Sequence, residues 1–419
     1  MALTLTVAFA LFLALKIGVK YWLAWRQIRH VTAHADDVPA QFVDRVSLDS
    51  HRKAAHYTVT KTRLAIIETA VGAAVLVALT LLGGLQWIND FLQTFVTDEL
   101  LHQVAVVTTV TIVMSAVDLP FSWIRQFRIE QQFGFNRMTP KLWLIDLFRS
   151  VAIAAALGLP LLAVTIGLMQ RAGDAWWIYV WLLWVSFNAA VLLLYPTIIA
   201  PLFNKFEPLK DAALAERINA LLARSGFSSS GVFVMDGSKR SAHGNAYFTG
   251  LGRSKRIVFF DTLIDRLRAP EIEAVLAHEL GHFKLKHITK RLAFSFASSL
   301  ALLALLGWLL TQSWFFEGLG VEAPAPGTGQ GVALLLFMLV MPVFAFAFAP
   351  LGNIISRKHE FEADRFAASN ASAQDLVTAL VTLYQDNAST LTPDPVHSAF
   401  YDSHPPASIR IARLLQQPA

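Results

Sequence analysis

The 419-residue sequence contains no cysteine. Disulfide bonds and thiol chemistry are therefore excluded, and any metal ligands must be His, Asp or Glu side chains. Charged residues are also scarce: they make up 16% of the chain, against about 25% in ordinary soluble domains. Hydrophobic residues make up 55%, and the mean hydropathy is +0.49. This composition indicates an α-helical polytopic membrane protein with an attached polar portion.

Seven apolar runs are long enough to cross a bilayer as helices. They cover residues 3–24, 64–87, 103–124, 150–169, 176–200, 291–311 and 331–352. The first run could instead be a signal peptide, but it lacks a basic n-region and a small-residue cleavage site. We therefore interpret it as a retained span, and the sequence predicts about seven transmembrane helices in a lipid bilayer.

Segments rich in Lys and Arg alternate with segments that are poor in them. The poor segments are 89–101, 169–175 and 312–330, which hold one basic residue among them. By the positive-inside rule, the N-terminus is then extracytosolic and the C-terminus cytosolic. The net charge of +5 accordingly reflects membrane orientation rather than binding to nucleic acid. We expect the plasma (inner) membrane in a bacterium, or the endoplasmic reticulum in a eukaryote.

Composition divides the chain into four segments. Residues 1–200 are a membrane region with the first five spans, 201–289 are polar, 290–352 hold the last two spans, and 353–419 form a polar tail. The two polar segments fall on the same, cytosolic side of the membrane. We therefore expect them to form one domain that is split around the last two spans.

The first polar segment mixes helix and strand patterns. Periodicity predicts a helix over 211–224, and β-branched and aromatic runs predict strands over 232–235, 246–249 and 257–261. Gly250 and Gly252 would lie in the connection between the last two strands. The pattern predicts an α+β domain, with a mostly helical tail completing it.

The most informative motif is His278-Glu279-Leu280-Gly281-His282, which has the form H-E-x-x-H. Pro270 suits the first turn of a helix over this region. On a helix, His278 and His282 share a face, so both imidazoles can reach one metal ion. Glu279 is placed to hold an attacking water, as in hydrolytic zinc sites. A chance match occurs in on the order of a percent of chains this long, so the interpretation requires a third ligand.

A candidate third ligand lies at the start of the tail. Glu360 and Asp364 are four residues apart, so they share a helical face and could supply one ligand and one carboxylate that orients a ligand imidazole. Such a pair could also be an ordinary solvated acidic face. His359 and Glu362 are rival ligands, but they point to other sides of the same helix.

These motifs together resemble the type I CAAX prenyl protease family of integral-membrane zinc endopeptidases. The resemblance rests on the H-E-x-x-H motif with a distant Glu-Phe-x-Ala-Asp, and it extends from about residue 60 to the end. Further matching stretches are Phe127–Glu130, Phe133–Asn136, Ile199–Phe206, Asn245–Phe248 and Ser403–Pro406. The resemblance implies a gluzincin-like zinc protease domain, and seven spans that enclose a water-filled chamber.

The resemblance also implies the parts of the active site. His278, His282 and Glu360 would hold one Zn²⁺ per chain. Glu279 would be the general base, and Asp364 would orient a ligand imidazole and assist proton transfer.

Three further residues are assigned by the resemblance alone. His404 would donate a hydrogen bond to the oxyanion, although by itself a His before Pro405 is more often a turn residue. Asn245 and Ala246 would lie on an edge strand that binds the extended substrate.

Three functions remain open at this point. The first is proteolysis of C-terminal prenylated tails, with a peptide or prenylated protein as substrate. The second is quality control of membrane proteins, as performed by related bacterial proteases that are shorter and have fewer spans. The third is a non-catalytic membrane scaffold, which the intact Glu279 argues against. Nothing in the sequence indicates an oligomeric state.

Overall fold

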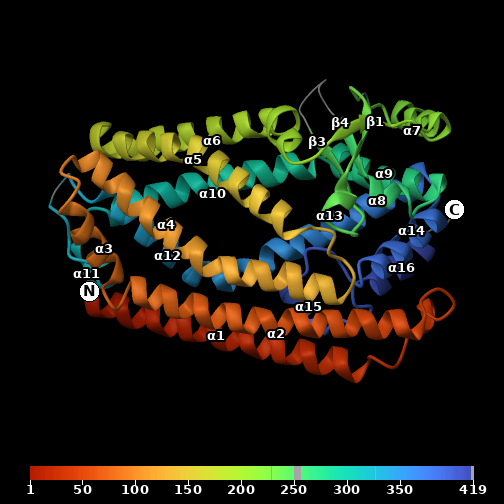
Figure 1. Ribbon diagram of the computed structural model, residues 1–419, viewed down its shortest axis with the longest axis horizontal. Helices are drawn as coiled ribbons and strands as arrows, with labels where there is room; N and C mark the ends of the chain where they lie inside the picture. The colour runs from red at the N-terminus through yellow and green to blue at the C-terminus, as the bar shows by residue number, and fades with distance from the viewer. Residues whose placement is uncertain (228, 250–255, 326, 417–419) are drawn as a thin grey trace.

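The computed structural model describes residues 1–227, 229–249, 256–325 and 327–416. Within these residues, seven helices are long and apolar enough to cross a membrane, which confirms the prediction. Their main helical segments are α1 (Ala2–Ala33), α2 (Leu48–Leu79), α4 (Glu99–Ile124), α5 (Pro140–Arg171), α6 (Trp176–Leu194), α10 (His287–Leu309) and α12 (Gln330–Phe344). The shorter helices α3 (Gly84–Gln93) and α11 (Ser313–Glu317) lie together at one end of the molecule (Figure 1).

Several helices continue beyond the apolar runs that predict them. Helix α1 reaches Ala33, past the end of the run at residue 24. The third span continues from α4 through a π-helical turn, Arg125–Glu130, beyond the end of the predicted run at residue 124. Helix α12 continues through a 3₁₀ turn into α13 (Ala349–Asn370). An apolar run therefore predicts the part of a helix that lies in the membrane, but not where the helix ends. A helix can continue into water with polar residues, because its backbone hydrogen bonds are made within the helix there too.

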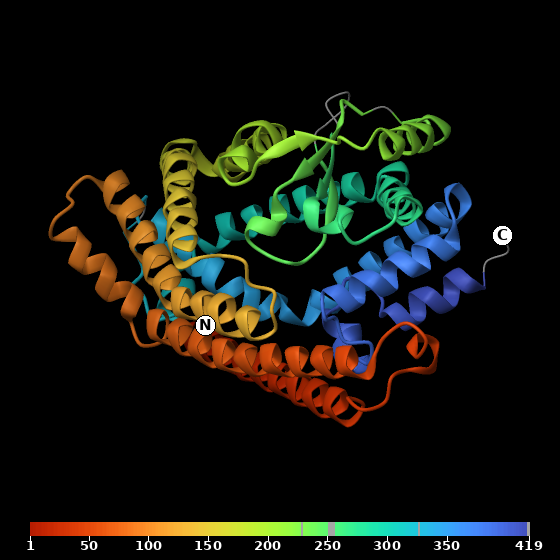
Figure 2. The same ribbon diagram turned by 45° about the vertical axis from the view of Figure 1, so that its right-hand side comes forward.

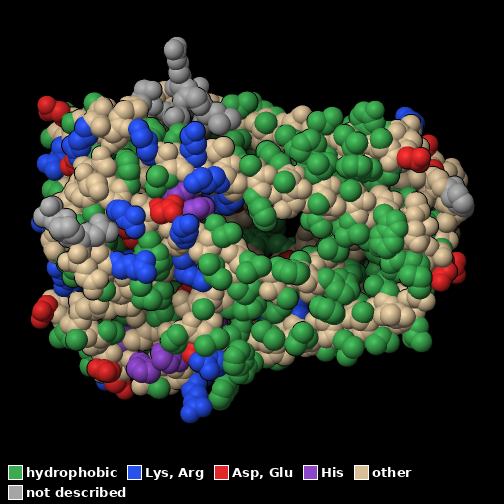
Figure 3. All heavy atoms as spheres, turned by 180° about the vertical axis from the view of Figure 1, so that it is seen from behind, with side chains coloured by type: hydrophobic (Ala, Val, Ile, Leu, Met, Phe, Trp, Pro, Cys, Tyr) green, Lys and Arg blue, Asp and Glu red, His purple; other side chains and the backbone are tan. Residues whose placement is uncertain are grey.

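The membrane helices pack most closely at the end that carries α3 and α11. A buried cluster there includes Phe9, Leu85, Val106, Phe316 and Leu336. Elsewhere burial is low: in each of the first six spans, only 6–17% of the most apolar window is buried. Figure 3 shows an opening between the helices on the face opposite to that of Figure 1. The helices therefore leave an opening between them on that face.

The polar domain contains a four-stranded sheet with the order β1-β2-β4-β3. Its strands are β1 (Phe206–Pro208), β2 (Val232–Met235), β3 (Ala246–Thr249) and β4 (Arg256–Phe260). Strand β4 runs parallel to β2, whereas β1 and β3 run antiparallel to their neighbours, with Ala246 opposite Phe259. The three predicted strands are present, although β4 ends one residue early because Asp261 begins the short helix α8 (Asp261–Ile264). The expected glycine connection lies outside the described residues.

Helices from both polar segments complete the domain that contains this sheet. From the first segment come α7 (Ala212–Arg224) and α9 (Ala269–Lys284), and from the tail come α13, α14 (Ala373–Asp386), α15 (Pro395–Tyr401) and α16 (Ala407–Leu415). One buried cluster contains Leu221, Phe259 and Leu276 from the first segment together with Leu380 and Ile411 from the tail. The two segments thus share a hydrophobic core, and Figures 1 and 2 show them side by side at the end opposite α3 and α11.

Candidate metal centre

Helix α9 carries the H-E-x-x-H motif, and its N-terminus is well capped. The backbone N–H of Arg268 donates to the Glu271 carboxylate at 2.8 Å, and a proline occupies the first turn. Both features stabilise a helix start. His278 and His282 project from the same face of this helix, as the four-residue spacing predicts, and His278 is buried.

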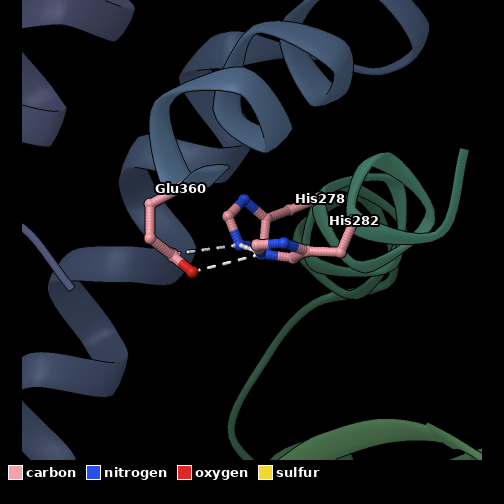
Figure 4. Close-up of side chains that lie close together, drawn as sticks. All are labelled: His278, His282 and Glu360. Carbon is pink, nitrogen blue, oxygen red and sulfur yellow. Dashed lines mark hydrogen bonds and ion pairs between the residues drawn. The ribbon is translucent and has the colours of Figure 1, made fainter. Parts of the chain in front are cut away.

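Glu360 reaches the two imidazoles from α13 (Figure 4). The Nε2 atoms of His278 and His282 are 3.2 Å apart, and they lie 3.4 and 3.2 Å from the two Glu360 carboxylate oxygens. Ligands about 2.0–2.1 Å from a tetrahedral ion lie about 3.3–3.4 Å from one another. In addition, the buried Oε2 of Glu360 has no hydrogen-bond partner among the described residues. The three side chains therefore have the chemistry and the spacing to hold one metal ion.

Asp364 and Arg410 lie behind His278. The Asp364 Oδ1 is 2.9 Å from the His278 Nδ1, and Arg410 donates to both Asp364 oxygens at 2.9 and 2.6 Å. Burial lowers the pKa of His278, but the adjacent Asp364 and Glu360 carboxylates outweigh it and raise the pKa to about 9. The metal-free site therefore keeps a proton on His278, which a metal ion would replace.

Arg410 is the member of this site that the sequence analysis missed. It is 5% exposed and also lies 3.6 Å from Glu360. A signal was available, because Arg410 lies on the same helical face as Ala407, Ile411 and Leu414, which are all buried. A charged residue on an apolar face indicates a buried partner.

The rival ligands do not face the H-E-x-x-H pair. Glu362 and His359 instead contact His287, the first residue of α10: the His287 Nε2 is 2.9 Å from Glu362, and the rings of His287 and His359 stack at 4.0 Å. Glu360 is thus the tail carboxylate that faces His278 and His282.

A cleft of about 370 Å³ opens beside the three candidate ligands, and the remaining predicted site residues line it. They are Glu279, His404, Asn245 and Ala246. The Nε2 of His404 lies 3.4 Å from a Glu360 oxygen, while 63% of the His404 side chain is exposed. The tail therefore brings His404 to the centre despite its distance in sequence.

Asn245 and Ala246 lie at the edge of the sheet, as expected. The Asn245 carbonyl accepts from the Phe260 N–H of β4 at 3.0 Å, so the Ala246 N–H points away from β4. That N–H donates to the Asn245 Oδ1 at 2.8 Å. A substrate strand that pairs at Ala246 must displace the Asn245 side chain.

Two protein-family models together match nearly the whole chain. A family model described as CAAX prenyl protease N-terminal, five membrane helices, matches residues 27–205, and one described as peptidase family M48 matches residues 208–417. The first match begins before residue 60, where the resemblance seen in the sequence begins.

Similar proteins include CAAX prenyl protease 1 homologs from Arabidopsis thaliana and from Oryza sativa. The first is 34% identical over 92% of each chain, and the second is 33% identical over 99% of this chain and 98% of the relative. The crystal structure of S. mikatae Ste24p superposes with a TM-score of 0.90 at 29% identity, over 98% of this chain and 99% of that one. The chain therefore belongs to the CAAX prenyl protease 1 family of membrane metallopeptidases.

Proposed function

We propose that the chain is a zinc endopeptidase that removes C-terminal tripeptides from prenylated proteins. Its relatives are named CAAX prenyl protease 1. The observation that supports this most strongly is the tetrahedral spacing of His278, His282 and Glu360 beside a cleft. Two imidazoles and one carboxylate favour zinc over calcium or magnesium, which prefer oxygen ligands alone.

The proposed site divides the hydrolytic chemistry among a few groups. A bound zinc ion would lower the pKa of a water molecule and polarise the scissile carbonyl. The Glu279 carboxylate takes a proton from the attacking water and gives it to the leaving amine, so that one water is consumed per peptide bond cleaved. His404 donates to the oxyanion of the tetrahedral intermediate, because it lies at the cleft beside Glu360.

The remaining residues position ligands and substrate. The Asp364 carboxylate accepts from the His278 Nδ1–H, which would leave the Nε2 lone pair free to bind a metal ion. Asn245 and Ala246 bind the substrate backbone at the edge of β3 once the Asn245 side chain has moved aside.

The proposed activity is tested by assaying the purified protein on a farnesylated CAAX peptide and on its unprenylated twin. We expect cleavage of the farnesylated peptide with release of one tripeptide, and much slower cleavage by the Glu279→Gln protein. Equal cleavage of both peptides would favour a general quality-control protease. Absence of any cleavage by zinc-loaded protein would favour the scaffold.

The proposed orientation places the metal centre on the cytosolic side. Ser313 and Lys239 are exposed, and the chain has no native cysteine. Ser313 begins α11 and Lys239 lies between β2 and β3, and α11 and the sheet lie near opposite ends of the molecule (Figure 1). A cysteine at Ser313 should react with an impermeant thiol reagent from outside intact cells, whereas one at Lys239 should not. The reverse result would invert the topology.

A further inference from the structure

The His282 imidazole makes a second contact through Nδ1, the ring nitrogen that faces away from the candidate metal position. Its Nε2 faces Glu360, while its Nδ1 lies 3.0 Å from the Nδ1 of His287. The other nitrogen of His287, Nε2, lies 2.9 Å from an oxygen of Glu362. His282, His287 and Glu362 therefore form a continuous chain of two hydrogen bonds that leads away from the centre.

The backbone between α9 and α10 is shaped to make this contact. Lys286 adopts a left-handed conformation with φ 57 and ψ 33, immediately before His287 begins α10. A non-glycine residue pays a conformational penalty there, and such strain persists where the surrounding structure requires it. The turn directs His287 back toward His282, and the His287 side chain is 4% exposed.

Proton placement in this chain has one consistent solution when a metal occupies the centre. A metal ion on the His282 Nε2 requires the proton of that ring to reside on Nδ1, which then donates to the His287 Nδ1. The His287 proton must accordingly lie on Nε2, where it donates to the Glu362 carboxylate. The Glu362 carboxylate, acting through His287, therefore favours the His282 tautomer that carries its proton on Nδ1 and can bind a metal through Nε2.

The same chemistry decides between this relay and a second metal site. His287, His359 and Glu362 are close enough to one another to hold an ion. However, an ion on the His287 Nε2 would displace the proton that Glu362 accepts. A neutral His287 would then donate from Nδ1 to His282, which would place the His282 proton on Nε2 and block the first centre.

We infer that His287 and Glu362 are positioning residues that hold His282 in its metal-binding tautomer, and that they act as a relay and not as a second metal site. This inference rests on the proposed zinc centre. It assigns to His282 a support that is separate from the Asp364–Arg410 pair behind His278. Both ligand imidazoles of α9 are thereby oriented through Nδ1, the nitrogen that does not face the metal position: His278 by Asp364 and His282 by His287.

The relay is tested by a matched pair of variants at one position. An asparagine at 287 places an oxygen near the position of the His Nδ1, so His287→Asn keeps an acceptor for His282. A glutamine extends toward the position of Nε2, so His287→Gln keeps contact with Glu362 but loses that acceptor. We expect His287→Gln to weaken zinc binding 10–100-fold, the range for lost outer-sphere partners, and His287→Asn to remain within a few-fold of the parent.

Zinc affinity is measured by chelator competition on the full-length protein in detergent, with the melting temperature of the metal-free protein measured alongside. A third variant, His359→Phe, keeps a ring stacked on His287 and should leave both the affinity and a stoichiometry of one zinc unchanged. Equal affinities of the Asn and Gln variants at equal melting temperature would overturn the relay. Two zinc ions in the parent, with one lost in His359→Phe, would instead establish a second metal site. A parent protein that binds no zinc would overturn the proposed cofactor itself.

Discussion

Gly281 of α9 lies directly against Ala363 of α13. A Cβ placed on Gly281 would lie 2.9 Å from the Ala363 Cα and 3.1 Å from the Phe366 Cβ. Backbone and Cβ atoms cannot move aside as the tip of a flexible side chain can. The glycine inside the H-E-x-x-H motif therefore sets how closely α9 approaches α13, and with it the distance from the two histidines to Glu360.

The first prediction follows from this contact. Gly281→Ala should force the two helices apart, at the cost of about 1–3 kcal/mol that is typical of overpacking, and should weaken zinc binding. Zinc content and melting temperature of the purified protein check it. Gly352→Ala on α13 is a matched control, because a Cβ there meets nothing within 4 Å. Equal zinc content and melting temperature of the two variants would show that the close approach of α9 and α13 is not needed for zinc binding or stability.

The second prediction concerns Glu279, which lines the cleft. Glu279→Gln keeps the shape of the side chain but removes its basic oxygen. Zinc content should be unchanged, while turnover falls by roughly 10²–10⁴, the range for loss of a general base. Single-turnover kinetics with zinc analysis of the same sample separate the two effects. Near-normal turnover would mean that another group activates the water.

The helical parts of the centre were predictable from the sequence. Helical periodicity fixes which side chains share a face, so the spacing alone places His278 with His282 and Glu360 with Asp364. Spans were predictable for a similar reason, because the bilayer requires long apolar runs. Helical geometry only places Glu360, His359 and Glu362 on different sides of their helix. The choice of Glu360 as ligand came from the family resemblance, and the structure shows Glu360 facing the histidines.

Strand β1 and the turn before His287 could not be predicted, because the residues around them show no pattern that indicates either feature. Strand β1 is three residues long and ends in Pro208, too short for an alternating pattern. The relay through His287 depends on a left-handed Lys286, a conformation that lysine does not favour and that sequence reasoning assigns to glycine or asparagine. Such features are imposed by tertiary packing rather than by local preference.

The third prediction concerns Arg410. Arg410→Leu removes one of the two partners of the buried Asp364 carboxylate and leaves only His278, and breaking a buried pair costs about 3–5 kcal/mol. We expect a lower melting temperature and weaker zinc binding. The double variant Asp364→Asn with Arg410→Leu should recover part of the stability, because the buried carboxylate that lost its Arg410 partner is gone. Failure of the double variant to recover any would indicate that Arg410 acts mainly through packing.

The fourth prediction concerns pH. The pKa of His278 is raised from its ordinary 6.5 to about 9, so the stabilisation of the metal-free protein by the protonated ring is fully present below pH 6.5 and is lost as the pH rises through about 9. Zinc must displace this proton. Its apparent affinity should therefore rise about tenfold per pH unit between these values and then level off. Chelator competition, corrected for the titration of the chelator, measures this slope, and a flat profile between pH 7 and 9 would contradict it.

The last prediction concerns His404, whose Nε2 lies 3.4 Å from Glu360 at the cleft. Pro405 and Pro406 stiffen the backbone that follows it, and in the proposed mechanism its donor would lie near the oxyanion. A donor that binds the oxyanion more strongly than the ground-state carbonyl affects kcat, and losing one costs about 2.7–4 kcal/mol in other enzymes. We expect His404→Ala to lose roughly 10²–10³ in kcat with little change in KM. Because 63% of the side chain is exposed, zinc content and melting temperature should stay unchanged. A variant that loses stability or zinc together with activity would make His404 a structural residue, and a variant with normal kcat would remove it from the mechanism.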